Sequence, residues 1–148
     1  MKKSTLALGL TTAMTFSGSL YAEALEAIKV YKSPTCGCCQ DWVNHLEDNG
    51  FEVDVTDTND MTSIKIDAGL QPSLASCHTA FVGDYVIEGH VPASDIHRLL
   101  KEAPQAHGLA VPGMPMGSPG MEIGDQKDNY QVLLFNEDGQ TKVFSEYN

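Results

Sequence analysis

The chain is poor in cationic residues. Its 148 residues include only 9 Lys and Arg against 20 Asp and Glu, which gives a formal net charge of −11. Proteins bind nucleic acids and anionic lipid surfaces largely through clustered positive charge. The composition therefore argues against both as partners of this protein.

Long hydrophobic runs are also scarce. The one apolar stretch, residues 6–20, is short for a membrane span and contains many Ser, Thr and Gly residues. It follows two lysines and precedes Ala22-Glu23-Ala24, which is the pattern of a secretory signal peptide. We expect residues 1–22 to be removed on export to the periplasm. That would leave 126 of the 148 residues, a net charge of −13 because two lysines and no acids are lost, and a mature chain without membrane insertion.

Cysteine is rare, but its distribution is uneven. Only four cysteines occur, and three of them are Cys36, Cys38 and Cys39, with Cys77 as the fourth. Three neighbouring cysteines cannot tie distant segments to one another, so structural disulfides alone do not explain the cluster. We therefore consider a chemical role for these thiols.

The cluster lies between an apolar strand-like run and a helix-like run, residues 40–48. Unpaired amides and the positive end of the dipole at a helix N-terminus favour thiolate over thiol. Thiolates are the nucleophiles of disulfide exchange and the soft ligands that select Cu(I) or zinc. The site is predicted to be redox-active, metal-binding, or both.

Hydrophobic periodicity predicts an α/β protein with the element order β-α-β-α-β-β-α. The expected elements are strands near 27–31 and 51–55, helices over 40–48 and 61–68, two short strands within 80–87, and a helix from 93 to 103. A C-x-x-C motif beside the first βαβ unit indicates a thioredoxin-like domain, which we assign to residues 23–105. Residues 106–148 form a C-terminal extension. Its first part, residues 108–124, is rich in Gly, Pro and Met and lacks periodicity, and strands 130–135 and 141–147 form a β-hairpin.

The cysteine spacing supports two interpretations. Cys36 and Cys39 have the C-x-x-C spacing of a thiol-disulfide oxidoreductase, with Cys36 as the nucleophile and Cys39 as the resolving thiol. Cys38 does not fit that scheme, because a third thiol between the pair invites misdirected disulfides. A metal site, in which several sulfurs converge on one ion or bridge several, gives Cys38 a use.

Proline is missing where a thioredoxin-like protein typically has one. In such proteins a cis-proline precedes the strand that faces the active cysteines and shields the dithiol from metal. Alignment on that strand puts the position near His78, and no proline occurs between Pro72 and Pro92. Cys77 and His78 occupy the stretch instead, so potential ligands replace a potential barrier.

Methionine and histidine add further candidate ligands. Three of the six methionines, Met114, Met116 and Met121, fall within ten residues of the extension, and thioethers suit Cu(I) far better than zinc. Filling of gaps beneath a loop is the structural alternative for them. His78 is the best imidazole candidate, while His90 follows a strand and could equally be structural.

Five segments form a distinctive combination: Cys-Gly-Cys-Cys at 36–39, Ser-Cys-His-Thr-Ala at 76–80, Glu-Gly-His-Val-Pro at 88–92, Gly-Leu-Ala-Val-Pro-Gly-Met-Pro at 108–115 and Gly-Ser-Pro-Gly-Met-Glu at 117–122. Together they resemble the CopG-type family of bacterial periplasmic copper-resistance proteins. The resemblance implies a thioredoxin-like domain whose extension helps to bind metal, and several copper ions bridged by cysteine sulfur. It also implies redox handling of Cu(I) and Cu(II) in support of a periplasmic copper-efflux component. Met116 belongs to this pattern less clearly than Met114 and Met121.

These observations predict a monomeric periplasmic copper-binding protein for copper resistance. The expected ligands are Cys36, Cys38, Cys39, Cys77, His78, His90, Met114 and Met121. Two alternatives stay open, a metal-free oxidoreductase that uses Cys36 and Cys39, and a passive Cu(I) carrier. The sequence does not decide whether the protein is an enzyme.

Overall fold

A computed structural model describes residues 27–148, so the predicted signal peptide lies outside the described residues. Seven strands form one mixed sheet in the order β2-β1-β3-β4-β5-β6-β7 within that part of the chain. The strands are β1 (Ile28–Lys32), β2 (Val53–Asp57), β3 (Thr79–Val82), β4 (Tyr85–Glu88), β5 (Gly108–Ala110), β6 (Tyr130–Phe135) and β7 (Thr141–Tyr147). The helices are α1 (Gly37–Asp48), α2 (Met61–Asp67) and α3 (Ala93–Glu102), with a short 3-10 turn η1 (Pro72–Leu74).

The predicted α/β order is confirmed along the first part of the chain. Strand β1 pairs in parallel with β2 and antiparallel with β3, and β3 and β4 form a tight antiparallel hairpin. The hairpin of β6 and β7 has the predicted bounds. Strand β1 shows the expected alternation, with Ile28 and Val30 buried and Lys29 exposed.

The structure contains a strand that the sequence does not predict. Residues 108–124 lack periodicity in the sequence, but Gly108–Ala110 form β5, which pairs in parallel with β4 and antiparallel with β6. All three residues are buried, so no alternation marks the strand in the sequence. Gly108 permits the pairing, because a Cβ at this position would lie 1.8 Å from the carbonyl oxygen of Val86.

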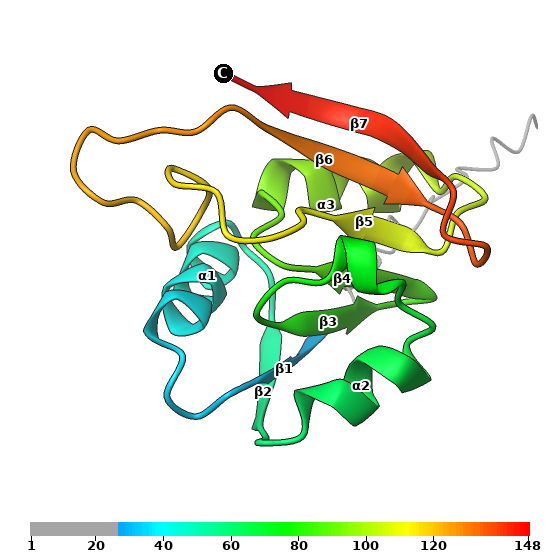
Figure 1. The fold of residues 1–148 in the computed structure, drawn as a ribbon, viewed down its shortest axis with the longest axis horizontal. Coiled ribbons are helices and arrows are strands. Elements are labelled where there is room, and N and C mark those ends of the chain that lie inside the picture. The colour runs from blue at the N-terminus through cyan, green and yellow to red at the C-terminus, as the bar shows by residue number, and fades with distance from the viewer. Residues whose placement is uncertain (1–26) are drawn as a thin grey trace, which may run out of the picture.

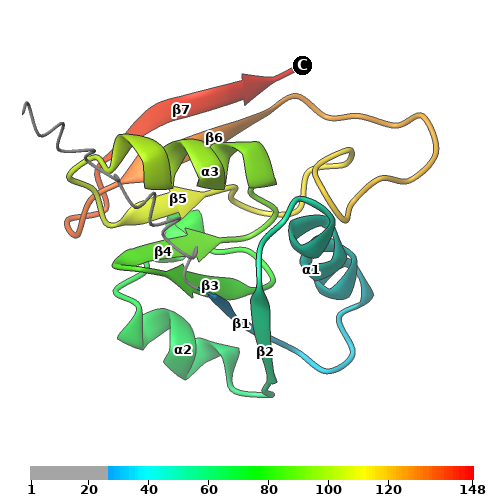
Figure 2. The ribbon, with the colours of Figure 1, turned by 180° about the vertical axis from the view of Figure 1, so that it is seen from behind.

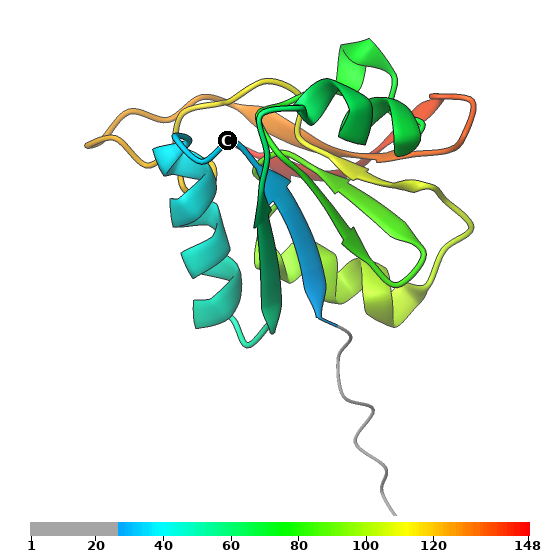
Figure 3. The same cartoon turned by 90° about the horizontal axis from the view of Figure 1, so that it is seen from below.

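Helices cover both faces of the sheet, as Figures 1 and 3 show. Helices α1 and α3 bury the larger apolar cluster, with Trp42, Ile96 and Leu99 packed against sheet residues such as Ile28 and Ile87. Ala68, which follows α2, and Leu74 of η1 form a second apolar cluster with Val86 and Phe135. The N-terminal part of α1 lies beside the loop that follows β5, and Gly120 of that loop approaches the backbone of Cys38 (Figure 3).

The β6–β7 hairpin is held to α3 by a polar cluster, on the side seen in Figure 2. The buried carboxylate of Asp95 accepts hydrogen bonds from the hydroxyls of Tyr147, at 2.7 Å, and Ser145. Arg98 donates to the carbonyl oxygen of Phe144 at 2.7 Å. Among the described helices, none is long and apolar enough to cross a membrane.

Candidate metal centre

The three neighbouring cysteines lie at the start of α1, as the sequence predicts. Cys36 is the N-cap residue in an extended conformation, and Cys38 and Cys39 occupy the first helical turn. Cys39 is fully buried, whereas Cys36 and Cys38 are half-buried. The thiols therefore meet the amide end of a twelve-residue helix, where negative charge is favoured.

Two of the four cysteines form a disulfide, and the sulfur of a free cysteine lies close to each of them. Cys36 and Cys39 form a disulfide with an S–S distance of 2.02 Å, while Cys38 and Cys77 are free. The sulfur of Cys38 is 3.4 Å from that of Cys36, and the sulfur of Cys77 is 3.4 Å from that of Cys39. All four sulfur atoms lie within 4.8 Å of one another.

A buried carboxylate positions the segment that carries Cys77. Glu88, at the end of β4, is fully buried and accepts a hydrogen bond from the backbone N–H of Ser76 at 2.6 Å. The same carboxylate accepts from Thr79 Oγ1 at 2.7 Å and from Lys65 Nζ at 2.5 Å. Glu88 thus holds the Ser76 backbone on one side of Cys77 and His78 and the Thr79 side chain on the other.

His78 directs one ring nitrogen to Cys77. Its Nδ1 lies 3.2 Å from the Cys77 sulfur, and its ring packs against Trp42 with a centroid distance of 4.3 Å. The residue is fully buried, and its Nε2 has no hydrogen-bond partner among the described residues. A buried ring nitrogen without a partner is unusual, because buried polar groups in proteins are normally hydrogen-bonded.

His90 approaches Cys77 from the loop after β4. Its Nε2 lies 3.1 Å from the Cys77 sulfur, and its Nδ1 lies 2.8 Å from the carbonyl oxygen of Pro119. Because a carbonyl can only accept, Nδ1 carries the proton and Nε2 presents its lone pair to the sulfur. The carbonyl comes from the extension, so the extension takes part in forming the site.

Two further contacts attach the extension to the site. The Ser76 hydroxyl donates to the carbonyl oxygen of Gly113, and the Gly113 N–H donates to the carbonyl oxygen of Ala75 at 3.2 Å. Gly120 packs on the first turn of α1, where a Cβ would lie 2.6 Å from the carbonyl oxygen of Cys38.

Six of the eight predicted site residues come together. Of the other two, Met114 is 53% exposed and Met121 is half-buried. Their segment reaches the cluster through Pro119 and Gly120. The ligand role of the two thioethers remains a prediction.

Burial controls the protonation of the buried groups. It lowers the pKa of His90, and it lowers that of His78 well below its ordinary value, with repulsion from His90 and Lys65 adding to the effect. Burial and the neighbouring Cys38 raise the pKa of Cys77 to about 11. The imidazoles are therefore neutral near pH 7 and ready to bind metal, whereas Cys77 must lose a proton to do so.

The donor set fits a soft metal ion. The second group of donors, Cys77, His78 and His90, has its ligand atoms within 4.8 Å of one another and shares Cys77 with the four-sulfur group. Thiolate and neutral imidazole are the ligands that copper and zinc prefer. The arrangement could hold metal, or it could carry out thiol-disulfide exchange.

Sequence reasoning missed some contacts of polar residues that depend on the tertiary structure. Nothing in the sequence marks Glu88 as buried, because it is a single acid at the end of a short strand. His45 Nε2 accepts the N–H of Ala93 at 3.1 Å, so it caps α3 from the neighbouring helix. This contact depends on how two helices pack, which the sequence does not show.

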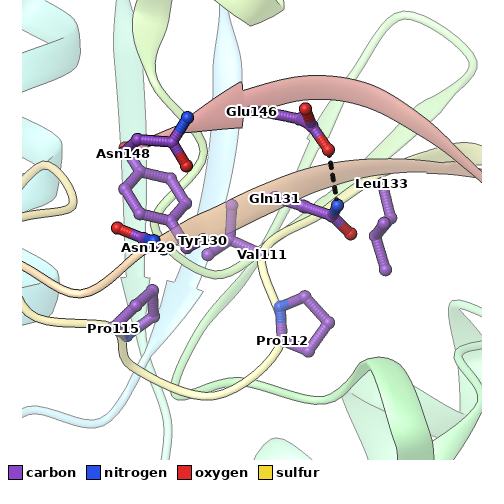
Figure 4. Close-up of a pocket in the computed structure, with 9 residues that line it drawn as sticks. All are labelled: Val111, Pro112, Pro115, Asn129, Tyr130, Gln131, Leu133, Glu146 and Asn148. Atoms are coloured by element: carbon purple, nitrogen blue, oxygen red, sulfur yellow. Dashed lines mark hydrogen bonds between the residues drawn. The ribbon is translucent and has the colours of Figure 1, made fainter.

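One pocket of the protein contains none of the predicted site residues. Its volume is about 460 Å³, and it opens between the start of the extension and the hairpin (Figure 4). The residues drawn there include Val111, Pro112, Pro115, Tyr130, Gln131 and Glu146, the last two joined by a 2.7 Å hydrogen bond. No nucleophile or metal-ligating cluster lines it, so the cysteine cluster is the stronger candidate site.

Comparisons with known proteins show the family of the chain. A family model described as "Protein of unknown function, DUF411" matches residues 74–121, the stretch that contains Cys77, His78, His90, Met114 and Met121. No curated protein matches the chain.

Two solved structures, titled copper resistance protein CopG Form 1 and Form 2, are both 48% identical to the chain with a TM-score of 0.79. They cover 84% and 82% of this chain, respectively, and 98% of their own chains. Such identity over nearly the whole length of the relative establishes common descent. The chain belongs to the CopG family of copper resistance proteins.

Proposed function

We propose that this protein binds copper in the periplasm as a cysteine-bridged cluster of several ions and interconverts Cu(I) and Cu(II) in support of copper efflux. The observation that carries the proposal is the sharing of Cys77 by two adjoining donor groups, one of four sulfurs and one of a sulfur and two imidazoles. Four sulfurs exceed what one Cu(I) ion needs, so bridging of several ions uses the whole set.

The donors also suit both oxidation states. Thiolates and the thioethers of Met114 and Met121 favour Cu(I), whereas the harder nitrogens of His78 and His90 suit Cu(II). In this proposal the extension closes over the cluster, excludes water and supplies the methionine sulfurs. The Pro119 and Gly120 contacts support that placement of the extension.

The scaffold is proposed to be thioredoxin-like over residues 23–105. The order β2-β1-β3-β4, with β1 parallel to β2 and antiparallel to β3, supports this assignment. His78 directly precedes β3, where such a scaffold usually carries its proline. Residues 1–22 are proposed to export the chain, which would act as a monomer and pass copper to a periplasmic efflux component.

Copper content per chain tests the proposal. Mature protein reduced to four free thiols is loaded with Cu(I) without oxygen, desalted and analysed for metal and protein. We expect more than one copper per chain, and fewer in Cys38→Ser. One copper per chain, unchanged in Cys38→Ser, would refute the shared cluster. No retained copper would refute copper binding itself.

The Cys36–Cys39 disulfide supports a second function, metal-free thiol-disulfide exchange. It predicts reduction of a disulfide substrate such as insulin by the metal-free protein in the presence of a dithiol. This activity should survive Cys38→Ser and disappear in Cys36→Ser. A passive Cu(I) carrier is the third possibility, and it predicts tight Cu(I) binding without a stable Cu(II) form.

A further inference from the structure

The disulfide divides the candidate ligands into two sets. It removes Cys36 and Cys39 as thiolates, so the four-sulfur group retains only Cys38 and Cys77 as free thiols. The group of Cys77, His78 and His90 contains neither disulfide cysteine. Oxidation of the pair therefore leaves this second group chemically complete.

The second group also has the dimensions of a single metal site. The Cys77 sulfur lies 3.2 Å from His78 Nδ1 and 3.1 Å from His90 Nε2. Donor atoms that bind one ion at about 2.0 Å for nitrogen and 2.3 Å for sulfur lie roughly 3–4 Å apart. Only small adjustments are needed to place one ion among the three atoms.

Contacts outside the disulfide hold each of these ligands. Glu88 binds the backbone beside Cys77, and the carbonyl oxygen of His78 accepts the N–H of Gly89 at 3.1 Å. Pro119 fixes the tautomer of His90. Both histidines are fully buried, so the site is prepared whether Cys36 and Cys39 are joined or not.

We propose that the redox state of Cys36 and Cys39 sets how much copper the protein holds, with one Cu(I) retained at Cys77, His78 and His90 in the disulfide form. The inference rests on the proposed copper-binding function and adds a switch to it. The reduced chain would hold the larger cluster, and formation of the disulfide would release the ions that depend on Cys36 and Cys39.

Cu(II) is the oxidant that forms the disulfide in this proposal. The Cys36 and Cys39 thiolates each give one electron, the S–S bond forms, and two Cu(II) ions become two Cu(I) ions. Any proton still on either thiol goes to water. A dithiol reductant reverses the change of the protein by giving two electrons and two protons, and it becomes a disulfide itself.

The test compares the two redox forms of the unaltered mature chain. One sample keeps the disulfide and has two free thiols per chain. The other is fully reduced and has four. Both are loaded with Cu(I) without oxygen, desalted and analysed for copper, and thiols are counted again to verify that the disulfide persists. We expect one copper in the disulfide form and more in the reduced form.

Each outcome bears on a different claim. Copper in the reduced form alone would overturn this inference and leave the proposed function standing. Equal amounts of copper in both forms would overturn the switch, and absence of copper from both would overturn the proposed function as well. X-ray absorption of the copper-loaded disulfide form should show one sulfur and two nitrogen neighbours, and a shell made of sulfur alone would also refute the site.

Variants locate the retained ion. In the disulfide form, His90→Ala should retain much less than one copper, whereas Cys38→Ser should still retain one. His97→Ala is the matched histidine control, because His97 contacts the carbonyl oxygen of Asn49 and none of the three ligands. Loss of copper in His97→Ala that equals the loss in His90→Ala would overturn the assignment.

Discussion

The Nδ1 of His90 lies 2.8 Å from the carbonyl oxygen of Pro119, so a residue of the extension decides which nitrogen of this histidine is free. The free nitrogen, Nε2, faces Cys77. A hydrogen bond to the distal nitrogen is the usual means by which proteins orient a metal-binding imidazole. The extension therefore orients His90 through Pro119, independently of any contribution from its methionines.

Displacement of the extension should weaken copper binding. Gly120 has φ +83°, and a Cβ there would lie 2.6 Å from the carbonyl oxygen of Cys38 and 2.7 Å from the backbone nitrogen of Trp42. In Gly120→Ala the loop must move off α1 and take Pro119 with it. We expect the variant to lose copper affinity by at least tenfold, measured by competition with a Cu(I) chelator.

Gly124→Ala is the matched control for this experiment. Gly124 has φ +58°, but nothing lies within 4 Å of the position that its Cβ would take. Its cost should be limited to backbone strain of about 1–2 kcal/mol in the free energy of unfolding. Equal losses of copper affinity in the two variants would show that contact of Gly120 with α1 does not matter for the site.

Removal of the Glu88 carboxylate should harm both stability and copper binding. Glu88→Ala leaves the largely buried Lys65 without its partner and the Ser76 N–H without an acceptor. Breaking a buried ion pair in this way typically costs about 3–5 kcal/mol. Denaturant unfolding of the metal-free protein measures the loss of stability, and chelator competition measures the loss of copper affinity.

A double variant separates the two effects of Glu88. Lys65→Met combined with Glu88→Met removes both charges, so part of the lost stability should return. The Ser76 N–H still lacks its acceptor, so copper binding should stay weak. Copper affinity that recovers together with stability would mean that Glu88 does not position Cys77.

Local sequence patterns predict most of the secondary structure and the position of the cysteine turn. The helices, the hairpins and the C-x-C-C turn follow from local periodicity and turn residues, and the approach of Cys77 and His78 to that turn follows from alignment on β3. Strand β5 was missed because three buried residues carry no period.

Long-range contacts account for most of the remaining differences. The sequence pattern favours surface positions for His97 and His107, but both are half-buried. His97 stacks on Phe51, and His107 contacts the carbonyl oxygen of Ala68. The burial of Glu88 and the pairing of His90 with Pro119 likewise join segments distant in sequence. Local patterns do not carry such information.

His45 should matter for stability and not for copper. Its Nε2 accepts the N–H of Ala93 at the start of α3, where Pro92 offers no side-chain cap. In His45→Ala this N–H loses its acceptor, at a cost of about 1 kcal/mol. Thermal unfolding should show the loss, and copper per chain should not change. A drop in copper content would assign His45 to the metal site instead.

The high pKa of Cys77 should make the disulfide form less stable in alkali. Burial and the neighbouring Cys38 raise this pKa to about 11, above the value of about 8.5 for an unfolded cysteine. The folded state therefore holds its proton more tightly, and the stability contributed by Cys77 is fully present below pH ~8.5 and lost as the pH rises toward 11.

Denaturant unfolding of the metal-free disulfide form at pH 7.5 and pH 10 measures this loss. Tyr130 and Tyr147 also have raised pKa values and contribute in the same direction, so the quantity to compare is the difference between the wild-type protein and Cys77→Ala. The wild-type protein should lose more stability than the variant between the two pH values. Equal losses would mean that Cys77 is in contact with water and that its pKa is not raised. Iodoacetamide at pH 8 gives a second test. A buried Cys77 should react roughly 100-fold more slowly than an unfolded cysteine, whereas a Cys77 in contact with water would react as fast.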